Sequence, residues 1–375
     1  MIDVERVRTR AELREFITLP RRLYDGLPGF VAPLDFDRQQ MLDPAKAAFF
    51  THGVASYWIA RRNGAPVGRV SAQIDFAATG PQARDIGLFG CLDAIDDGDV
   101  VAALLQTAET WLRQRKRRIV RGPFLLSING EPGLLVEGEH EPPVTLLGWH
   151  PSYLAKHLAS AGYPVATRLF CFIHGEVPED RLDDLGRARA RAQITVRPLR
   201  LEAIDAEMEL GRRIFNDGWT KNWSFTPATE SDVADLVKQF KPFFFPDSGF
   251  FIDVRGEPAA FVLSIPNIFD ITADLGPRPS PLGWLRLLYR IWRQRYRGFR
   301  LALIGIGTKY QNSVIGGLIS TVAFAEVQDR LRARKVKEVI AGWIVEQNQA
   351  AIRPLGTLGF RQTRIYNLYE KALEN

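Results

Sequence analysis

The stretch Leu301–Asn348, LALIGIGTKYQNSVIGGLISTVAFAEVQDRLRARKVKEVIAGWIVEQN, decides the fold. It begins with an apolar run, continues through a short polar turn into a long segment with apolar residues at helical spacing, and ends in a second apolar run. Asn312 or Ser313 is a suitable N-cap for the helix, and Gly316 with Gly317 allows a close approach to the backbone of its first turn. The stretch therefore predicts two strands joined by an amphipathic helix.

The polar turn before this helix predicts a binding site for an anion. It carries a lysine and two amide side chains but no carboxylate. Free N–H groups at a helix N-terminus, with a lysine beside them, attract a phosphate or pyrophosphate. An ordinary strand–helix–strand crossover without a ligand is the alternative. The candidate cofactor-binding residues are Lys309, Gln311, Asn312, Ser313, Gly316 and Gly317.

The whole chain has the composition of a globular protein. Its 375 residues, 46% hydrophobic and 25% charged, predict two domains or one double-sized unit. The charged start, MIDVERVRTRAELREF, shows no secretory signal, and Cys91 and Cys171 stand in apolar surroundings that predict reduced thiols. We therefore expect a cytoplasmic protein. The five histidines are scattered without metal-ligand spacing, so we expect no structural metal.

Positive charge is concentrated in one segment. No acidic residue occurs between Asp274 and Glu326, so an anionic neighbour is expected. In the run PLGWLRLLYRIWRQRYRGFR, helical spacing puts Trp284, Leu288, Ile291 and Trp292 on one stripe and arginines on another. This pattern predicts a helix at the anionic inner face of the cytoplasmic membrane; a solvated basic helix or a nucleic-acid patch is the alternative. The candidate membrane-facing residues are Trp284, Arg286, Arg290, Trp292 and Arg293.

The second half of the chain repeats the order of the first. Residues 63–66 (NGAP) align with residues 255–258 (RGEP) at an offset of 192, and both segments predict the turn of a hairpin, at Asn63-Gly64 and at Arg255-Gly256. Asn129 aligns with Asn348 at an offset of 219. The 27-residue difference (219 − 192) predicts an insertion in the second half, where the acid-free segment lies. We therefore predict one unit over residues 1–175, a linker over 176–193, and a second unit over 194–375 with an amphipathic insertion at 275–300.

The order of elements in the second half, from Ile194 to a last predicted strand at Arg361–Tyr369, resembles the GCN5-related N-acyltransferase (GNAT) fold. This resemblance implies an α/β fold with two GNAT-like α/β/α units in tandem, each a mixed central sheet flanked by helices. It also implies that the turn opening the long helix holds the pyrophosphate of coenzyme A, although the residues before Gly316-Gly317 depart from the usual pattern. The matching turn of the first half carries Asp96, Asp97 and Asp99, whose charge would repel a pyrophosphate, so we expect no cofactor there.

Three residues near the ends of strands are candidates for catalysis. Glu346, at the end of the second predicted strand of the central stretch, suits a general base for an attacking ammonium group. Asn348 is a candidate to bind the cofactor or to position Glu346, and Tyr366 to protonate the leaving thiolate. The alternatives are a salt bridge at the rim for Glu346, a turn cap for Asn348 and strand packing for Tyr366.

An aromatic stretch, FNDGWTKNWSFTP at Phe215–Pro227, is the candidate acceptor site. Large rings with amide groups nearby can line an apolar pocket with polar anchors. The candidate residues are Trp219, Asn222 and Trp223. Core packing at a junction between helix and loop is the alternative.

Longer phrases carry a more specific resemblance. LYDGLPGFVAPL, GRVSAQID, GPFLLSINGEPGLLVEG, NDGWTKNWSFTP and GWIVEQN resemble a group of tandem GNAT-like bacterial proteins that includes the bacterial ceramide synthases. The resemblance implies transfer of a fatty acyl group from acyl-CoA, as co-substrate, to the amine of a sphingoid base. An acetyl-CoA-dependent enzyme acting on a small molecule or peptide, and a non-catalytic membrane adaptor on a decayed fold, are the two alternatives.

Overall fold

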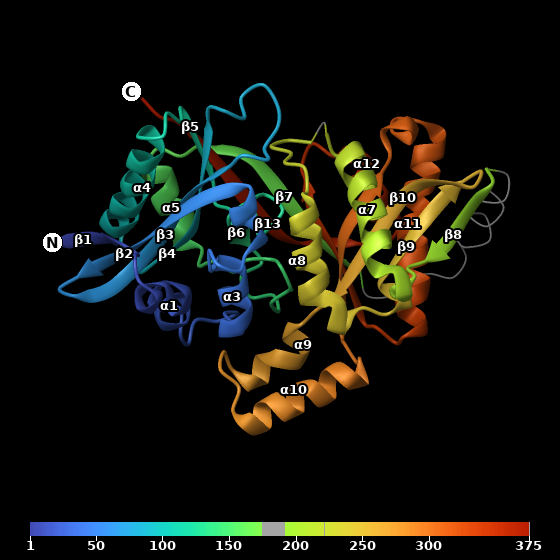
Figure 1. Cartoon of the computed structure of the whole chain (residues 1–375), viewed down its shortest axis with the longest axis horizontal. Coiled ribbons are helices and arrows are strands. Elements are labelled where there is room, and N and C mark those ends of the chain that lie inside the picture. The colour runs from blue at the N-terminus through green and yellow to red at the C-terminus, as the bar shows by residue number, and fades with distance from the viewer. Residues whose placement is uncertain (175–191, 221, 375) are drawn as a thin grey trace. The chain divides into compact units, whose positions relative to one another are not determined.

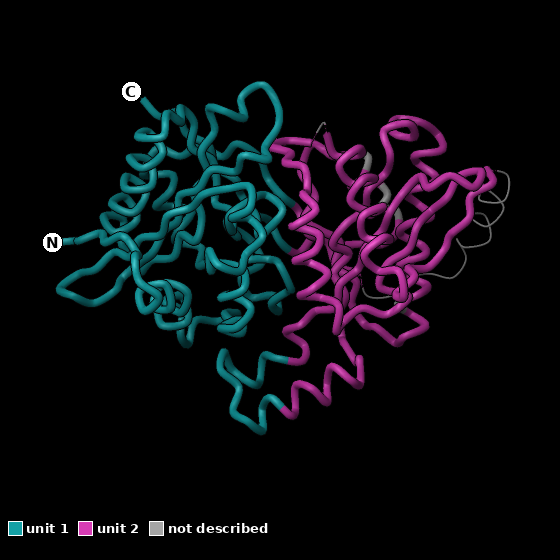
Figure 2. Tube along the Cα trace, in the orientation of Figure 1, with its two compact units in different colours: residues 1–169, 272–284, 364–375 teal, residues 170–271, 285–363 magenta. Residues whose placement is uncertain are grey.

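The computed structural model describes residues 1–174, 192–220 and 222–374. The chain folds into two compact units (Figure 2). Unit 1 comprises Met1–Leu169, Thr272–Trp284 and Arg364–Asn375, and unit 2 comprises Phe170–Ile271 and Leu285–Thr363. Residues 176–191 of the predicted linker lie outside the described residues. The sequence boundaries at 175 and 194 stay a prediction about the duplicated units.

Unit 1 contains a mixed sheet. Its first four strands are antiparallel neighbours in chain order, and the fifth is parallel to the fourth. The hairpin predicted at Asn63-Gly64 is confirmed, and both residues have positive φ, 51° and 79°. The strands are β1 (Ile2–Arg6), β2 (Gly53–Arg62), β3 (Ala65–Asp75), β4 (Ile86–Ala94), β5 (Ile119–Gly122) and β6 (Leu134–Glu137), and β7 (Val165–His174) runs from unit 1 into unit 2.

The helices of unit 1 bury apolar side chains against this sheet. α4 (Gly98–Arg113) connects the parallel strands β4 and β5 and contributes Val101, Leu104 and Leu105 to the main hydrophobic core. The other helices are α1 (Arg10–Thr18), α2 (Pro20–Leu23), α3 (Asp35–Leu42) and α5 (Tyr153–Ser160).

The last strand of the chain differs from its prediction. It was expected over Arg361–Tyr369 in the second half, but β13 spans Arg361–Ala372, and from Arg364 onward it belongs to unit 1. There it pairs antiparallel with β5, with Tyr369 opposite Gly122. The partner of a strand depends on contacts distant in sequence, so the order of elements alone could not assign it.

Unit 2 contains the strand–helix–strand segment predicted over Leu301–Asn348, which the structure confirms. β11 (Gly298–Ile306) and β12 (Glu338–Val345) are parallel and are joined by α11 (Val314–Ala333), which packs on β10 and β11 (Figure 1). The remaining strands are antiparallel, and the hairpin predicted at Arg255-Gly256 is confirmed. They are β8 (Ile194–Pro198), β9 (Gly249–Val254) and β10 (Glu257–Pro266).

The helices that precede the hairpin of unit 2 are α7 (Ile204–Gly218), which packs on β10 and β11, and α8 (Glu230–Phe240). Two arginines at the protein surface bind the buried carboxylate of Glu207 near the start of α7: Glu207 accepts from Arg197 at 2.7 Å and from Arg200 at 2.7 Å. Burial raises the pKa of Glu207, but the hydrogen bonds from both arginines outweigh it and hold the pKa below its ordinary value. Further helices among the described residues are α9 (Phe269–Thr272), α12 (Gln349–Thr357) and α10 (Pro281–Arg293), which passes from unit 1 into unit 2 after Trp284. Within the described residues, no helix is both long and apolar enough to cross a membrane.

Candidate active site

The two parallel strands of unit 2 are paired only over their first halves. In the part of the chain that the structure describes, their register runs from Gly298 opposite Glu338 to Leu301 opposite Ala341. Both strands nevertheless continue, to Ile306 and Val345 respectively. Beyond Leu301 and Ala341 the two strands are not paired with each other, although β11 stays paired with β10, and residues 302–304 and 343–344 are half-exposed. The carboxyl-terminal half of this strand pair is therefore open to a group that bonds to the backbone or packs between the strands.

The aromatic residue that closes α7 lies at this opening. Trp219 donates from Nε1 to the carbonyl oxygen of Ile304, on the part of β11 that is not paired with β12, at 3.1 Å. Its ring meets Trp343, on the unpaired part of β12, edge to face, with centroids 5.8 Å apart. Trp219 therefore contacts both strands where they are no longer bonded to each other.

The other two candidates for the acceptor site lie in the turn after Trp219. The backbone N–H of Asn222 donates to the carbonyl of Trp219 at 2.9 Å, and its carbonyl accepts from Phe225 at 3.2 Å. The side chains of Asn222 and Trp223 are both half-exposed. Of the three candidates, Trp219 is the one whose contacts place it at the opening between β11 and β12.

Glu346 is the first residue after β12, at the carboxyl end of this opening. Its side chain is half-buried, and its Oε1 lies 3.5 Å from Nε2 of Gln347. Two residues further on, Oδ1 of Asn348 accepts the N–H of Ala351 at 3.2 Å and so caps α12. The capping role that the sequence left as an alternative for Asn348 is thus present, and its amide group still has N–H donors.

The turn before α11 is built by the hydroxyl of Ser313. This oxygen accepts the N–H of Gly316 at 3.0 Å and donates to the carbonyl of Tyr310 at 2.6 Å, so Ser313 rather than Asn312 caps the helix. Asn312 has a positive φ of 54°, which turns the chain into the helix. Among the described residues, the N–H groups of Val314 and Ile315 have no acceptor. The helix therefore presents two free donors to an anion.

The two glycines of this turn have different surroundings. A Cβ at Gly316 would lie 2.2 Å from the carbonyl oxygen of Tyr310, so this position accepts no side chain without a shift of the backbone. A Cβ at Gly317 would meet no described atom within 4 Å. Gly316 therefore lets the turn close on the helix, and Gly317 leaves the helix backbone open on its other side.

Neighbouring elements bring carboxylates to this turn, which the sequence showed as free of them. Asp217, at the end of α7, accepts from the N–H and the hydroxyl of Thr308 at 2.7 and 2.9 Å. Glu257, at the start of β10, pairs with Lys309 at 2.8 Å; this contact raises the pKa of Lys309 and lowers that of Glu257. The Gln311 amide donates to the carbonyls of Gly218 and Ile306, at 2.6 and 2.9 Å. Gln311 thus holds the turn in place, and the positive charge of Lys309 is balanced in part by the carboxylate of Glu257.

The remaining candidate residues belong to β13 and α10. Tyr366 belongs to unit 1, is 1% exposed and packs beside Gly133, whereas Glu346 belongs to unit 2. On α10, Trp284 and Trp292 are exposed, and so are Arg286 and Arg293. Arg290 is half-buried and donates to the carbonyl of Ile271 at 2.9 Å.

The N-terminus of α4, the matching helix of unit 1, is capped by a carboxylate of the same unit. Oδ1 of Asp97 accepts from the N–H groups of Asp99 and Val100, at 3.0 and 3.2 Å, and so caps α4. Its Oδ2 pairs with Arg62 at 2.7 Å, and this hydrogen bond lowers the pKa of Asp97. The N–H groups that bind an anion at other helix ends are therefore already bonded here to a side chain of the unit itself.

Comparison with known proteins places the chain in a family. It is 35% identical over 376 residues to bacterial ceramide synthase of Caulobacter vibrioides, covering 99% of this chain and 98% of that protein. The chain belongs to the tandem GNAT-like family of bacterial ceramide synthase. Protein YghO of Escherichia coli, 34% identical over 365 residues and covering 96% of this chain and 93% of its own length, is a further relative. No protein-family model matches the chain.

Solved structures show the same fold at low identity. A tandem GNAT protein from the clavulanic acid biosynthesis pathway is 12% identical, with a TM-score of 0.55, covering 100% of this chain and 99% of that chain. The GCN5-related glucosamine N-acetyltransferase region of a fungal multi-domain GH3 β-N-acetylglucosaminidase is 13% identical, with a TM-score of 0.59. That match covers 99% of this chain but 38% of the fungal chain. The predicted tandem GNAT fold is confirmed, and fold and family together support an N-acyltransferase.

Proposed function

We propose that the chain is an acyl-CoA-dependent N-acyltransferase that transfers a fatty acyl chain to the amine of a sphingoid-base-like acceptor. The observation that carries this proposal is the relationship to bacterial ceramide synthase, 35% identical over nearly the full length of both chains. The open end of the β11–β12 pair, with Trp219 beside it and Glu346 at its carboxyl end, supports the same conclusion.

The turn before α11 is the proposed site for the pyrophosphate of acyl-CoA. The donors at Val314 and Ile315 suit its negative charge, and the open side of Gly317 leaves room for it beside the helix backbone. Lys309 supplies a positive charge, part of which Glu257 balances in the structure as described. Ser313, Gly316 and Gln311 shape the turn, and Asn312 sets its direction. The residues of this turn therefore fit an anionic ligand, provided that Lys309 turns from Glu257 toward the ligand.

Glu346 is the proposed general base. Its carboxylate would take a proton from the ammonium group of the acceptor, so that the free amine attacks the thioester carbonyl. The new amide bond then forms as the carbon–sulfur bond breaks, the nitrogen gives up its second proton, and the leaving thiolate of coenzyme A takes up that proton. Asn348, two residues from Glu346, would hydrogen-bond through its amide N–H groups to either substrate.

The acceptor would lie against Trp219, with Asn222 and Trp223 in the adjoining turn. Indole rings offer a large apolar surface to a hydrocarbon chain, and an amide anchors a polar headgroup. Because both substrates carry long chains, we place the enzyme at the inner surface of the cytoplasmic membrane.

Product formation from palmitoyl-CoA and sphinganine, followed by mass spectrometry, tests the proposed function. We expect the N-acylated base to form, and Glu346→Gln to lower the rate by about 100-fold or more. Glu338→Gln is the matched control: it changes a glutamate at the opposite end of β12 that pairs with Arg297 at 2.6 Å. Transfer of an acetyl group only, from acetyl-CoA, would favour the alternative of a small-molecule acetyltransferase. Full activity of Glu346→Gln would exclude Glu346 as the general base.

A further inference from the structure

Helix α10 leaves most of its apolar side chains uncovered. Large apolar residues recur along one side of it at intervals of three and four residues, the spacing of a single helix face. Such a cluster of exposed large side chains on one helix marks an interaction surface. Its members, with their exposed fractions, are Leu282 (77%), Leu285 (62%), Leu288 (60%), Tyr289 (57%) and Trp292 (74%).

The opposite side of α10 is fixed to the protein. Leu287 is 5% exposed, and Arg290 donates to the carbonyl of Ile271. Ile291, which the sequence placed on the outward apolar stripe, is only half-exposed, and Arg290, expected to face the membrane, is turned toward the protein. The outward face is therefore rotated from the predicted one.

The segment that enters α10 is also anchored. Within unit 1, Arg278 pairs with Asp35 of α3 at 2.5 Å, and the N–H of Asp35 donates to the carbonyl of Pro277 at 3.0 Å. Arg21 approaches the same carboxylate at 2.9 Å. These contacts hold the chain a few residues before the helix begins. The apolar face is thus part of a defined structure and not of a loose end.

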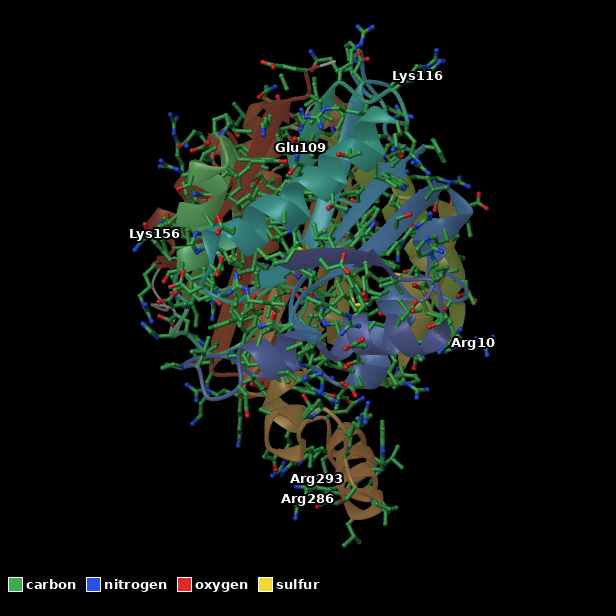
Figure 3. All side chains as sticks on the ribbon, turned by 90° about the vertical axis from the view of Figure 1, so that its left-hand side faces the viewer. Arg10, Glu109, Lys116, Lys156, Arg286 and Arg293 are labelled. Carbon is green, nitrogen blue, oxygen red and sulfur yellow. The ribbon has the colours of Figure 1, made fainter. Side chains whose placement is uncertain are left out.

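All charged residues in the sequence segment that contains α10 are positive. Arg286 and Arg293 are exposed on α10, one on each side of Leu288 and Tyr289 in sequence, and Figure 3 shows both on this helix. The guanidinium group of Arg293 lies over the Tyr289 ring, 6.0 Å from its centroid. No acidic residue occurs from 275 to 325. Because the two arginines are seven residues apart, they lie along one edge of the apolar face. The partner that complements this surface is therefore anionic along that edge and apolar across the rest of the face.

We propose that the outward face of α10 docks on an anionic phospholipid surface. The exposed leucines and Trp292 would enter the region of the acyl chains, and Arg286 and Arg293 would bind the phosphate groups. A nucleic acid would match the arginines but would leave the leucines in water. This inference does not depend on the proposed acyl transfer, because docking requires no turnover.

Cosedimentation of the full-length protein with lipid vesicles tests the docking. We expect binding to vesicles of phosphatidylcholine with phosphatidylglycerol, and much weaker binding to phosphatidylcholine alone or at high salt. Arg286→Gln with Arg293→Gln should weaken binding about 30-fold, and Leu285→Ser with Trp292→Ser by at least about tenfold. Lys156→Glu on α5 and Phe76→Ser after β3, both at exposed positions, are the controls for charge and for apolar surface.

Three results would overturn the proposal. They are no binding to the anionic vesicles, equal loss of binding in the controls and the α10 variants, and a wild-type dimer in gel filtration that the α10 variants dissociate. The last result would make a second copy of the chain the occupant of this face. Thermal unfolding at the wild-type temperature shows that each variant is folded, as expected for exposed positions. Quenching of tryptophan fluorescence by brominated lipids, reduced in Trp292→Phe, would confirm which side enters the bilayer.

Discussion

Alanine at Gly317 should stabilise the free protein and weaken its binding of coenzyme A. Its Cβ would meet no described atom within 4 Å, so the substitution costs no contact in the free protein. Alanine is favoured over glycine inside a helix by about 1 kcal/mol, so the free energy of unfolding should rise by up to that amount. If the pyrophosphate lies beside this backbone, the added methyl group occupies its space, and the dissociation constant should rise by about tenfold.

Alanine at Gly316 is the matched control for this prediction. There the Cβ would lie 2.2 Å from the Tyr310 carbonyl oxygen, so the turn has to move. Overpacking of this kind costs about 1–3 kcal/mol, of which the helix preference of alanine returns about 1 kcal/mol. Gly316→Ala should therefore lose both stability and affinity, whereas Gly317→Ala should lose affinity alone. Urea unfolding and calorimetric titration with coenzyme A measure the two quantities. Unchanged affinity in Gly317→Ala would refute the placement of the pyrophosphate.

Three further changes test other parts of the account. Glu257→Gln frees Lys309 from its counter-charge and should tighten coenzyme A binding about two- to threefold at low salt, which calorimetry would detect; no change would show that Lys309 does not face the ligand. Glu207→Gln should lower the free energy of unfolding by about 2 kcal/mol near pH 7, because Arg197 and Arg200 stay charged but no longer have the negative charge of Glu207 beside them. The pKa of Glu207 is lowered in the folded state, so the stability difference between wild type and variant should be lost only as the pH falls through and below 4.5. Urea titrations that show an equal stability difference at pH 3 and pH 7 would contradict this prediction. Trp219→Phe keeps an aromatic ring, though a smaller one, and removes the hydrogen bond to the carbonyl of Ile304. The free energy of unfolding should therefore fall by about 1 kcal/mol or more, and acyl transfer should slow. Unchanged values in urea unfolding and in the transfer assay would argue against the place of Trp219 at the opening.

Local patterns predicted much of the fold. The strand–helix–strand segment follows from apolar spacing and a capping hydroxyl, and both hairpins follow from turn residues that accept positive φ. These features depend on neighbours within a few residues along the chain, so the sequence displays them directly.

Contacts between distant segments could not be predicted in this way. Asp217 and Glu257 reach the turn before α11 from α7 and β10, 91 and 52 residues earlier in the chain than their partners. The edge-to-face contact of Trp219 with Trp343 likewise joins two separate elements. Nothing in the local sequence records these approaches, because packing of whole elements decides them. The same holds for the outward face of α10, which follows from the burial of Leu287.

The most direct test of the central claim is calorimetric titration of the purified protein with palmitoyl-CoA and with coenzyme A. We expect tight binding of palmitoyl-CoA and weaker binding of coenzyme A. Lys309→Glu, which places a second carboxylate beside Glu257, should weaken the binding of both ligands. Absence of binding by either ligand, or equal binding in Lys309→Glu, would contradict the claim that this turn holds an acyl-CoA.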